Sequence, residues 1–143
     1  MIVLDATSKS LEISAHSSAA FDVVVSYWSI DAAGLWTPQS YETAITGSGP
    51  TTILPAPASG VTKVVENIWI YIGTSGWSSS SQFVKIQLRT SPSVVRIIGW
   101  VEGTPSAFPG PNTVLVLKRD GSLIRNTAAM ASGATPQVNQ NIY

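Results

Sequence analysis

The sequence predicts an all-β fold, a single antiparallel β-sandwich or jelly roll followed by an extended C-terminal arm. Apolar residues recur with a period of two along most of the chain, the connections are rich in proline, glycine and serine, and no segment has the spacing of an amphipathic helix. The length of 143 residues fits one domain. We therefore expect seven or eight strands, with the sandwich domain in residues 1–126 and the arm in residues 127–143.

The strands are predicted from the alternation of apolar and polar side chains, taken in chain order. Leu11 and Ile13 flank Glu12 in the first strand, and residues 83–89 alternate most clearly between apolar and polar side chains. The remaining predicted strands span residues 21–30, 61–72, 94–102, 113–118 and 122–125. The first two of these, 21–30 and 61–72, have apolar residues at both odd and even positions, which is typical of strands buried on two sides.

The period of two also assigns side chains within residues 61–72 to faces. One face is predicted to hold Val64, Ile68, Ile70 and Ile72, and the other Val61, Val65, Trp69 and Tyr71. Three tryptophans fall in predicted strands, where we expect them to pack in the core or between the sheets. They are Trp28, Trp69 and Trp100.

Two connections carry turn or loop signals. Asp120-Gly121 lies between two apolar-rich runs and predicts a type I′ β-hairpin, because both central residues of that turn need positive φ. Residues 34–60 contain four prolines, four glycines and one charged residue, Glu42. We expect this segment to be a long loop of the sandwich domain, since loops of that length are usually functional or ordered by a neighbour.

The charge composition excludes several classes of partner. Eight Lys and Arg balance eight Asp and Glu, so the formal net charge is zero, and only 11% of residues are charged. Duplex nucleic-acid binding depends on many basic contacts to phosphates, and docking on anionic lipid needs clustered Lys and Arg. We therefore expect neither nucleic acid nor a membrane as a partner. The N-terminus does not resemble a signal peptide, and we expect synthesis in a host cytoplasm.

Residues suited to catalysis or metal binding are scarce. The chain has no cysteine, which excludes disulfides, thiolate nucleophiles and cysteine-based zinc sites. Its one histidine, His16, is expected in a turn or on the surface, since a triad with a serine and Asp5 or Asp22 lacks a nucleophile-elbow motif. The acidic residues are spread singly, without a carboxylate pair or a calcium loop. We expect no enzyme activity, no cofactor and no metal site.

Aromatic residues outside the predicted strands are candidates for contact with a partner. Trp36 and Trp77 fall in predicted loops, where they bind a protein partner, stack on sugar rings or anchor the loop. Tyr41 lies near Trp36 in the sequence, and the two are expected to form a small aromatic platform. The tail, residues 127–143, has no charged side chain and is either a flexible end or an arm laid across a neighbouring subunit.

Several segments resemble small structural proteins of tailed bacteriophages over residues 1–125. The resemblance is carried by the opening MIVLDATSKSLEI, VVSYWSI at 24–30, KVVENIWIYI at 63–72, the Pro109-Gly110 turn and the closing Asp120-Gly121 hairpin. Residues 73–81 depart from it, because the family has an Asn-containing turn there, and the C-terminal arm has no counterpart. The resemblance implies a virion component, either a capsid decoration (cement) protein or a tail-associated β-sandwich, that commonly assembles as a trimer.

From these observations we expect a bacteriophage virion structural protein, most directly a capsid decoration or cement protein on the capsid surface. It would form a homotrimer and stabilise the assembled capsid by binding the major capsid protein or other virion proteins. The alternative is a receptor- or carbohydrate-binding β-sandwich module of a phage tail fibre or collar. The residues expected to contact partners or other subunits are Met1, Ile2, Val3, Leu4, Trp36, Tyr41, Trp77, Val138, Ile142 and Tyr143.

Overall fold

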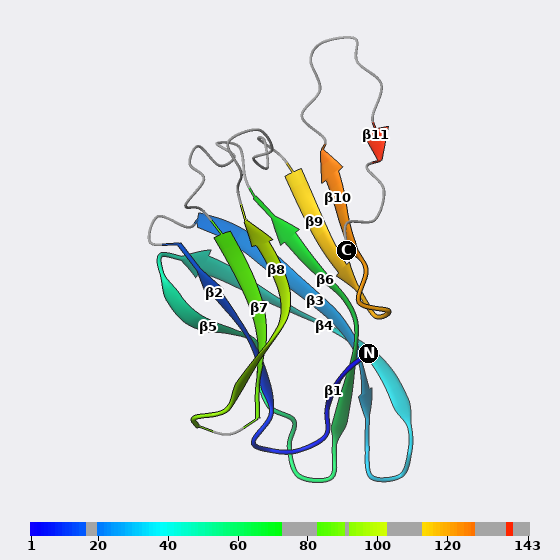
Figure 1. Ribbon diagram of the computed structural model, residues 1–143. Helices are drawn as coiled ribbons and strands as arrows, with labels where there is room; N and C mark the ends of the chain where they lie inside the picture. Colours follow the sequence, from blue (N-terminus) through cyan, green and yellow to red (C-terminus); the bar gives the residue numbers. More distant parts are fainter. Residues whose placement is uncertain (17–19, 73–82, 91, 103–112, 128–136, 139–143) are drawn as a thin grey trace.

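The computed structural model describes residues 1–16, 20–72, 83–90, 92–102, 113–127 and 137–138. These residues form two antiparallel sheets packed against each other, and none of them lies in a helix (Figure 1). The predicted all-β sandwich is therefore confirmed.

The larger sheet has seven strands in the order β11-β10-β9-β6-β3-β4, with β1 added beside β6. Its strands are β1 (Ile2–Leu4), β3 (Ala20–Ile30), β4 (Trp36–Thr46), β6 (Thr62–Tyr71), β9 (Thr113–Lys118), β10 (Leu123–Thr127) and β11 (Gln137–Val138). The smaller sheet has the order β5-β2-β7-β8. Its strands are β2 (Ser10–Ala15), β5 (Gly49–Leu54), β7 (Phe83–Arg89) and β8 (Val95–Glu102). All pairings are antiparallel.

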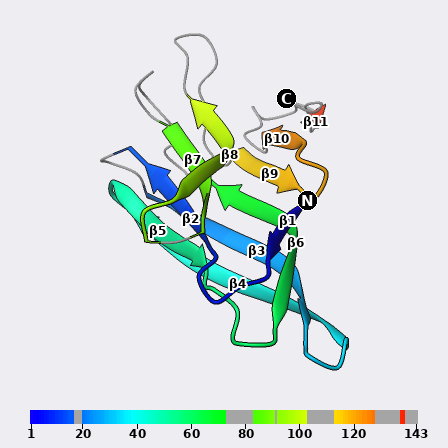
Figure 2. The same ribbon diagram turned by 60° about the horizontal axis from the view of Figure 1, so that its bottom comes forward.

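The two sheets face each other (Figure 2), and the core lies between them. Alternate side chains of each strand meet there. The smaller sheet contributes Leu11, Ile13, Val84 and Ile86, and the larger sheet contributes Val23, Val25, Ile68, Ile70, Leu115 and Leu117, all buried. The period of two predicted for these strands is therefore confirmed for the side facing the core.

A β-bulge in β6 changes which residues face the core. Ser26 of β3 pairs with Asn67, but the next residue, Tyr27, pairs with Val65, so Glu66 is the extra residue. On the C-terminal side of the bulge, the even-numbered residues Ile68 and Ile70 point inward, whereas on its N-terminal side the odd-numbered Val65 points inward. The prediction that groups Val64 with Ile68 and Val65 with Trp69 is therefore wrong across the bulge.

The prediction of a long loop over residues 34–60 is also wrong, because the segment forms β4 and β5. β4 pairs with β3 along its full length, from Ile30↔Trp36 to Ala20↔Thr46. Its proline does not prevent this, because β4 ends the strand order of the larger sheet and an edge strand tolerates a missing N–H. Gly47 and Gly49, both at positive φ, then lead the chain into β5 of the other sheet.

The Asp120-Gly121 hairpin joins β9 to β10 as predicted, but its turn is of another type. The Gly121 N–H donates to the Lys118 carbonyl at 2.9 Å, and the Lys118 N–H donates to the Ser122 carbonyl at 2.9 Å. Gly121 has a φ of 87°. This pattern is that of a three-residue loop, a type I turn closed by a glycine bulge, rather than the predicted two-residue type I′ turn.

The C-terminal arm is described only at β11. Gln137 and Val138 pair with Thr127 and Asn126 of β10, so this part of the arm adds a short strand to the chain's own larger sheet. The predicted boundary between residues 126 and 127 falls inside β10.

Candidate functional site

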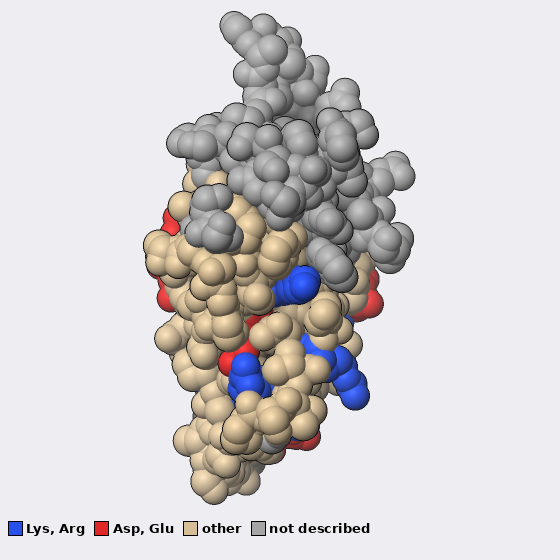
Figure 3. Space-filling view, turned by 60° about the vertical axis from the view of Figure 1, so that its left-hand side comes forward, with Lys and Arg blue, Asp and Glu red and all other residues tan. Residues whose placement is uncertain are grey.

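The most distinctive surface is the outward face of the larger sheet, on the side away from the core. Such a face of an antiparallel sheet is usually polar because water covers it. Only 11% of the residues are charged, and the outward positions of β3, β6 and β9 are mostly apolar. On another side of the molecule, scattered Lys, Arg, Asp and Glu lie among uncharged residues (Figure 3). The face divides into two apolar patches separated by a polar row.

The upper patch consists of Val24, Trp69, Tyr71, Val114 and Val116. The register places Glu42, Val24, Trp69 and Val116 side by side in one row, so the patch is bordered on its β4 side by a carboxylate. Ala44, Asp22, Tyr71 and Val114 form the next row. Trp69 is 42% exposed, whereas Val116 beside it is buried although it points away from the core. The tryptophan ring therefore lies at the centre of the patch, between two aliphatic neighbours.

The lower patch consists of Val3, Trp28, Ile30, Trp36, Pro38 and Val64. The pairings place Val3, Val64, Trp28 and Pro38 in one row across four strands. The Trp28 and Trp36 rings meet edge to face, with centroids 6.1 Å apart. This patch brings the predicted contact residues Val3 and Trp36, 33 positions apart in the sequence, onto one face.

The row between the patches is polar. Ser40, Ser26, Asn67 and Lys118 follow one another across β4, β3, β6 and β9. The Ser26 hydroxyl donates to the Asn67 carbonyl at 3.4 Å. Ordinary strand spacings give the face of β4, β3 and β6 alone a width of about 14 Å and a height of about 37 Å. A mostly apolar face of this size is typical of a surface that binds another macromolecule.

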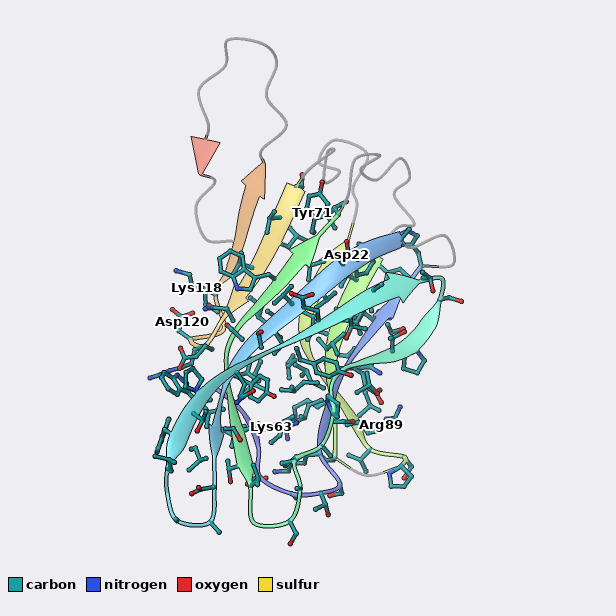
Figure 4. The ribbon with its side chains drawn as sticks, turned by 180° about the vertical axis from the view of Figure 1, so that it is seen from behind. Asp22, Lys63, Tyr71, Arg89, Lys118 and Asp120 are labelled. Atoms are coloured by element: carbon teal, nitrogen blue, oxygen red, sulfur yellow. The ribbon has the colours of Figure 1, made fainter. Side chains whose placement is uncertain are left out.

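A hollow of about 270 Å³ lies at the upper end of this face. Its lining consists of Ala20, Phe21, Asp22, Ala44, Ile45, Thr46 and Tyr71. The small side chains of Ala20 and Ala44 leave the space, while Asp22 and Tyr71 are cross-strand partners on its β6 side. Asp22 and Lys118 lie on opposite sides of β6 (Figure 4).

The predicted contact residues divide into several groups. Met1 is exposed, and Val3 and Trp36 belong to the lower patch. Leu4 is fully buried in the chain's own core and Ile2 packs against that core, so neither is presented to a partner. Trp77, Ile142, Tyr143 and the side chain of Val138 lie outside the described residues.

The predicted platform of Trp36 and Tyr41 is wrong. β4 pairs with β3 without a register shift, so residues an odd number of positions apart point to opposite faces. Trp36 therefore lies on the outward face, whereas Tyr41 lies on the same side as Tyr27. The pKa of Tyr27 is raised, first by burial and then by the nearby Tyr41.

Lys63 lies beside Tyr27 at this lower end of the sheet. Its ammonium group donates to the Pro55 carbonyl at 2.8 Å and lies 5.4 Å from the centre of the Tyr27 ring. Burial lowers the pKa of Lys63. The lysine thus ties β6 to the segment that follows β5, a structural role that accounts for its partial burial.

The tryptophans of the strands were expected in the core, and that prediction is wrong for two of them. Trp28 and Trp69 point outward from the larger sheet, because their strand neighbours Val25 and Ile68 fill the core. The side chain of Trp100 lies outside the described residues. The alternation of Ile68 and Ile70 with Trp69 and Tyr71 is the sequence signal that puts the two aromatic residues on one face, although it does not say which face is outward.

The outward face of the smaller sheet has a different character. Glu12 is only 6% exposed there and accepts hydrogen bonds from Arg89 Nε at 2.6 Å and from Gln87 Nε2 at 3.1 Å. Burial acts to raise the pKa of Glu12, but the bonds from Arg89 and Gln87 outweigh it, so the pKa is lowered. Val95 and Ile97 are exposed on the neighbouring strand β8. Glu12, Gln87 and Arg89 together form a structural clamp between β2 and β7.

The clamp makes stability depend on pH. Because folding lowers the pKa of Glu12, its contribution is complete above the ordinary value of 4.5 and is lost as the pH falls through the lower folded value. We expect Glu12→Gln to cost about 1 kcal/mol of unfolding free energy at pH 7, since hydrogen bonds to a charged group are stronger than neutral ones.

Urea unfolding of the native protein and of Glu12→Gln between pH 3 and pH 7 measures the contribution of the clamp to stability. The difference between native protein and variant should shrink as the pH falls. The acid dependence that the variant retains comes from carboxyls such as Asp5 and Asp120, whose pKa values are lowered chiefly by hydrogen bonds with Lys9 and Ser122. A difference that stays constant down to pH 3 contradicts the assignment.

His16 is buried rather than at the surface, at the end of β2. Its ring Nδ1 accepts a hydrogen bond from the Phe83 main-chain N–H at 3.2 Å, and the main-chain N–H of His16 donates to the Phe83 carbonyl at 3.3 Å. Among the described residues, no group of three or more histidines and carboxylates is placed to hold a metal ion. In the same part of the chain, no helix is long and apolar enough to cross a membrane.

Comparison with known proteins returns no relative. No protein-family model matches the chain, and no curated protein or solved structure matches it.

Proposed function

We propose that this protein is a structural component of a bacteriophage virion that assembles through the outward face of its larger sheet. The single observation that carries the proposal is the apolar character of that face, with Trp69 exposed at the centre of the upper patch and Trp36 exposed in the lower patch. A capsid decoration or cement protein is the role that the sequence resemblance favours. Its partners are then further copies of itself and the major capsid protein or another virion protein.

The mechanism is stabilisation by mass action. A protein that binds the assembled shell and not its separate subunits shifts the equilibrium toward the shell. Burial of aromatic and aliphatic side chains supplies the driving force, and tryptophan and tyrosine are the residues that most often dominate such contacts. A formal net charge of zero keeps long-range repulsion between neighbouring copies small. We propose an oligomer of identical chains, which the resemblance favours as a homotrimer.

A second candidate function is glycan binding by a module of a tail fibre or collar. Trp69 and Tyr71 lie two residues apart on one strand, both are exposed, and a carboxylate lies beside Tyr71. Aromatic faces of this kind stack on sugar rings, and carboxylates accept hydrogen bonds from hydroxyls.

Sedimentation separates the two functions. We expect the purified chain to sediment as an oligomer at micromolar concentration and to pellet with assembled capsids of the phage that encodes it. A 15.1 kDa monomer that stays in the supernatant contradicts the virion proposal. Saturable quenching of tryptophan fluorescence by oligosaccharides, lost in Trp69→Ser, would instead support the glycan-binding module.

A further inference from the structure

We infer that a second copy of this chain packs face to face on the upper patch about a two-fold axis at Trp69, with Lys118 of each copy in the Asp22 hollow of the other. The inference rests on the proposed function only in requiring that the chain associates with itself. It identifies which side chains make the contact, and its two-fold symmetry gives a dimer in place of the homotrimer that the resemblance favours.

The placement of the two charges about Trp69 is the first argument. Trp69 pairs with Val24 on β3 and with Val116 on β9. On β3, Asp22 lies two residues from Val24 and is level with Tyr71. On β9, Lys118 lies two residues from Val116 and is level with Asn67. Tyr71 and Asn67 lie on opposite sides of Trp69 along β6, so the two charges lie toward opposite ends of that strand. Asp22 and Lys118 therefore occupy diagonally opposite corners around the tryptophan, and Glu42, another acid of this face, lies one strand further out beside Val24.

This arrangement is self-complementary under a two-fold rotation. Consider a two-fold axis that runs parallel to the sheet over Trp69 and perpendicular to the line from Asp22 to Lys118. A half-turn about this axis brings the Lys118 position of one copy over the Asp22 position of the other. Each Lys118 then faces the Asp22 of the other copy, and the two tryptophans meet at the centre. The strands of the two copies cross at a steep angle, as in orthogonal packing of sheets. An isologous contact needs such a self-complementary surface.

The hollow beside Asp22 is the second argument. Its volume of about 270 Å³ and its small side chains, Ala20 and Ala44, leave room for the end of a long side chain. The Asp22 carboxylate supplies the opposite charge, and the exposed Tyr71 ring adds an aromatic neighbour for an ammonium group. A lysine from a facing copy thus meets a carboxylate and an aromatic ring, both of which attract an ammonium group.

Asp120 also lies close enough to Lys118 to interact with it. Its Oδ1, however, accepts hydrogen bonds from the Ser122 N–H at 2.8 Å and the Ser122 hydroxyl at 2.6 Å, which hold the carboxylate in the hairpin turn. Lys118 is on the outward face of β9, because its partner Asn67 is outward on β6. The lysine can therefore extend over the sheet while Asp120 stays in the turn.

A charge-swap experiment tests the contact. Lys118→Glu and Asp22→Lys are made separately, and association is measured by sedimentation velocity over a range of concentrations. Each variant alone places like charges opposite each other twice, so we expect self-association to weaken roughly 10- to 100-fold. Mixing the two variants restores both opposite-charge pairs in every mixed dimer, so we expect association to return to within a few-fold of the native strength.

The results distinguish a failure of this contact from a failure of the proposed function. A native oligomer that neither variant weakens, or two weakened variants whose mixture does not recover, overturns the contact and leaves the virion proposal intact. A native chain that is monomeric throughout overturns both. Circular dichroism and thermal unfolding of each variant confirm that it folds, and Lys85→Glu, on the outward side of the other sheet, is the matched control.

Discussion

Trp69→Ser is expected to leave the chain largely monomeric at concentrations that are just sufficient to associate the native protein. Truncating an aromatic residue at the centre of a contact typically costs about 2 kcal/mol or more, which weakens binding roughly 30-fold. The fold should survive, because the tryptophan is 42% exposed and the core behind it is filled by Ile68 and Ile70.

Sedimentation velocity measures the loss of association, and urea unfolding measures the stability of the variant. The matched control is Ile97→Ser, because Ile97 is comparably exposed but lies on β8 of the smaller sheet. We expect the control to associate like the native protein. Equal effects of the two substitutions would show that exposure alone, and not the face of the larger sheet, governs association.

Ile68→Ala is expected to lower the free energy of unfolding by about 2–5 kcal/mol, because it removes buried methyl and methylene groups and leaves a cavity. Ile68 is completely buried between the sheets, in register with Val25 and Leu117. For a domain of this size a loss of that order is a large share of the total stability.

Urea or guanidinium unfolding at pH 7 gives the value, with Ile68→Val as the graded control at about 0.5–1.5 kcal/mol. Ile68 and Trp69 are adjacent on β6 and point to opposite faces. Comparing Ile68→Ala with Trp69→Ser therefore separates an effect on stability from an effect on association. A loss below that of Ile68→Val would mean that this position is not at the centre of the core.

The sequence predicts β7 most clearly, because the alternation of that strand is set by a single buried face. In β7, Val84 and Ile86 face the core while Lys85 and Gln87 face outward, and the pattern is visible in the sequence itself. The hairpin at Asp120-Gly121 is predictable for a related reason, because a glycine at positive φ is a local requirement of the turn.

β4 and β5 could not be predicted in this way. Their residues are mostly polar or exposed, and Pro38 and Pro50 argue locally against strands. β4 forms because the preceding strand β3, 11 residues long, pairs with it along its whole length. β5 forms because β2, which lies far earlier in the sequence, pairs with it. Edge positions in the two sheets make the missing N–H groups of the prolines harmless.

The candidate site was missed for a different reason. The period of two separates Ile68 from Trp69 but does not say which face meets the other sheet, and the bulge at Glu66 reverses the assignment part way along β6. Aromatic residues in strands are usually core residues, so the sequence predicts that Trp28 and Trp69 point inward. Only the pairing of β6 with both β3 and β9 shows that Val24, Trp69 and Val116 form one outward row.

Hydroxyl-radical footprinting of the native protein, read by mass spectrometry, tests most directly whether the outward face of the larger sheet is the assembly surface. The chain is labelled at a concentration where it sediments as an oligomer and again where it is dilute. We expect oxidation of Trp69 and Tyr71 to fall several-fold on association, while that of Ile97 stays the same. An associated protein in which Trp69 and Tyr71 remain as reactive as in the dilute chain contradicts the account.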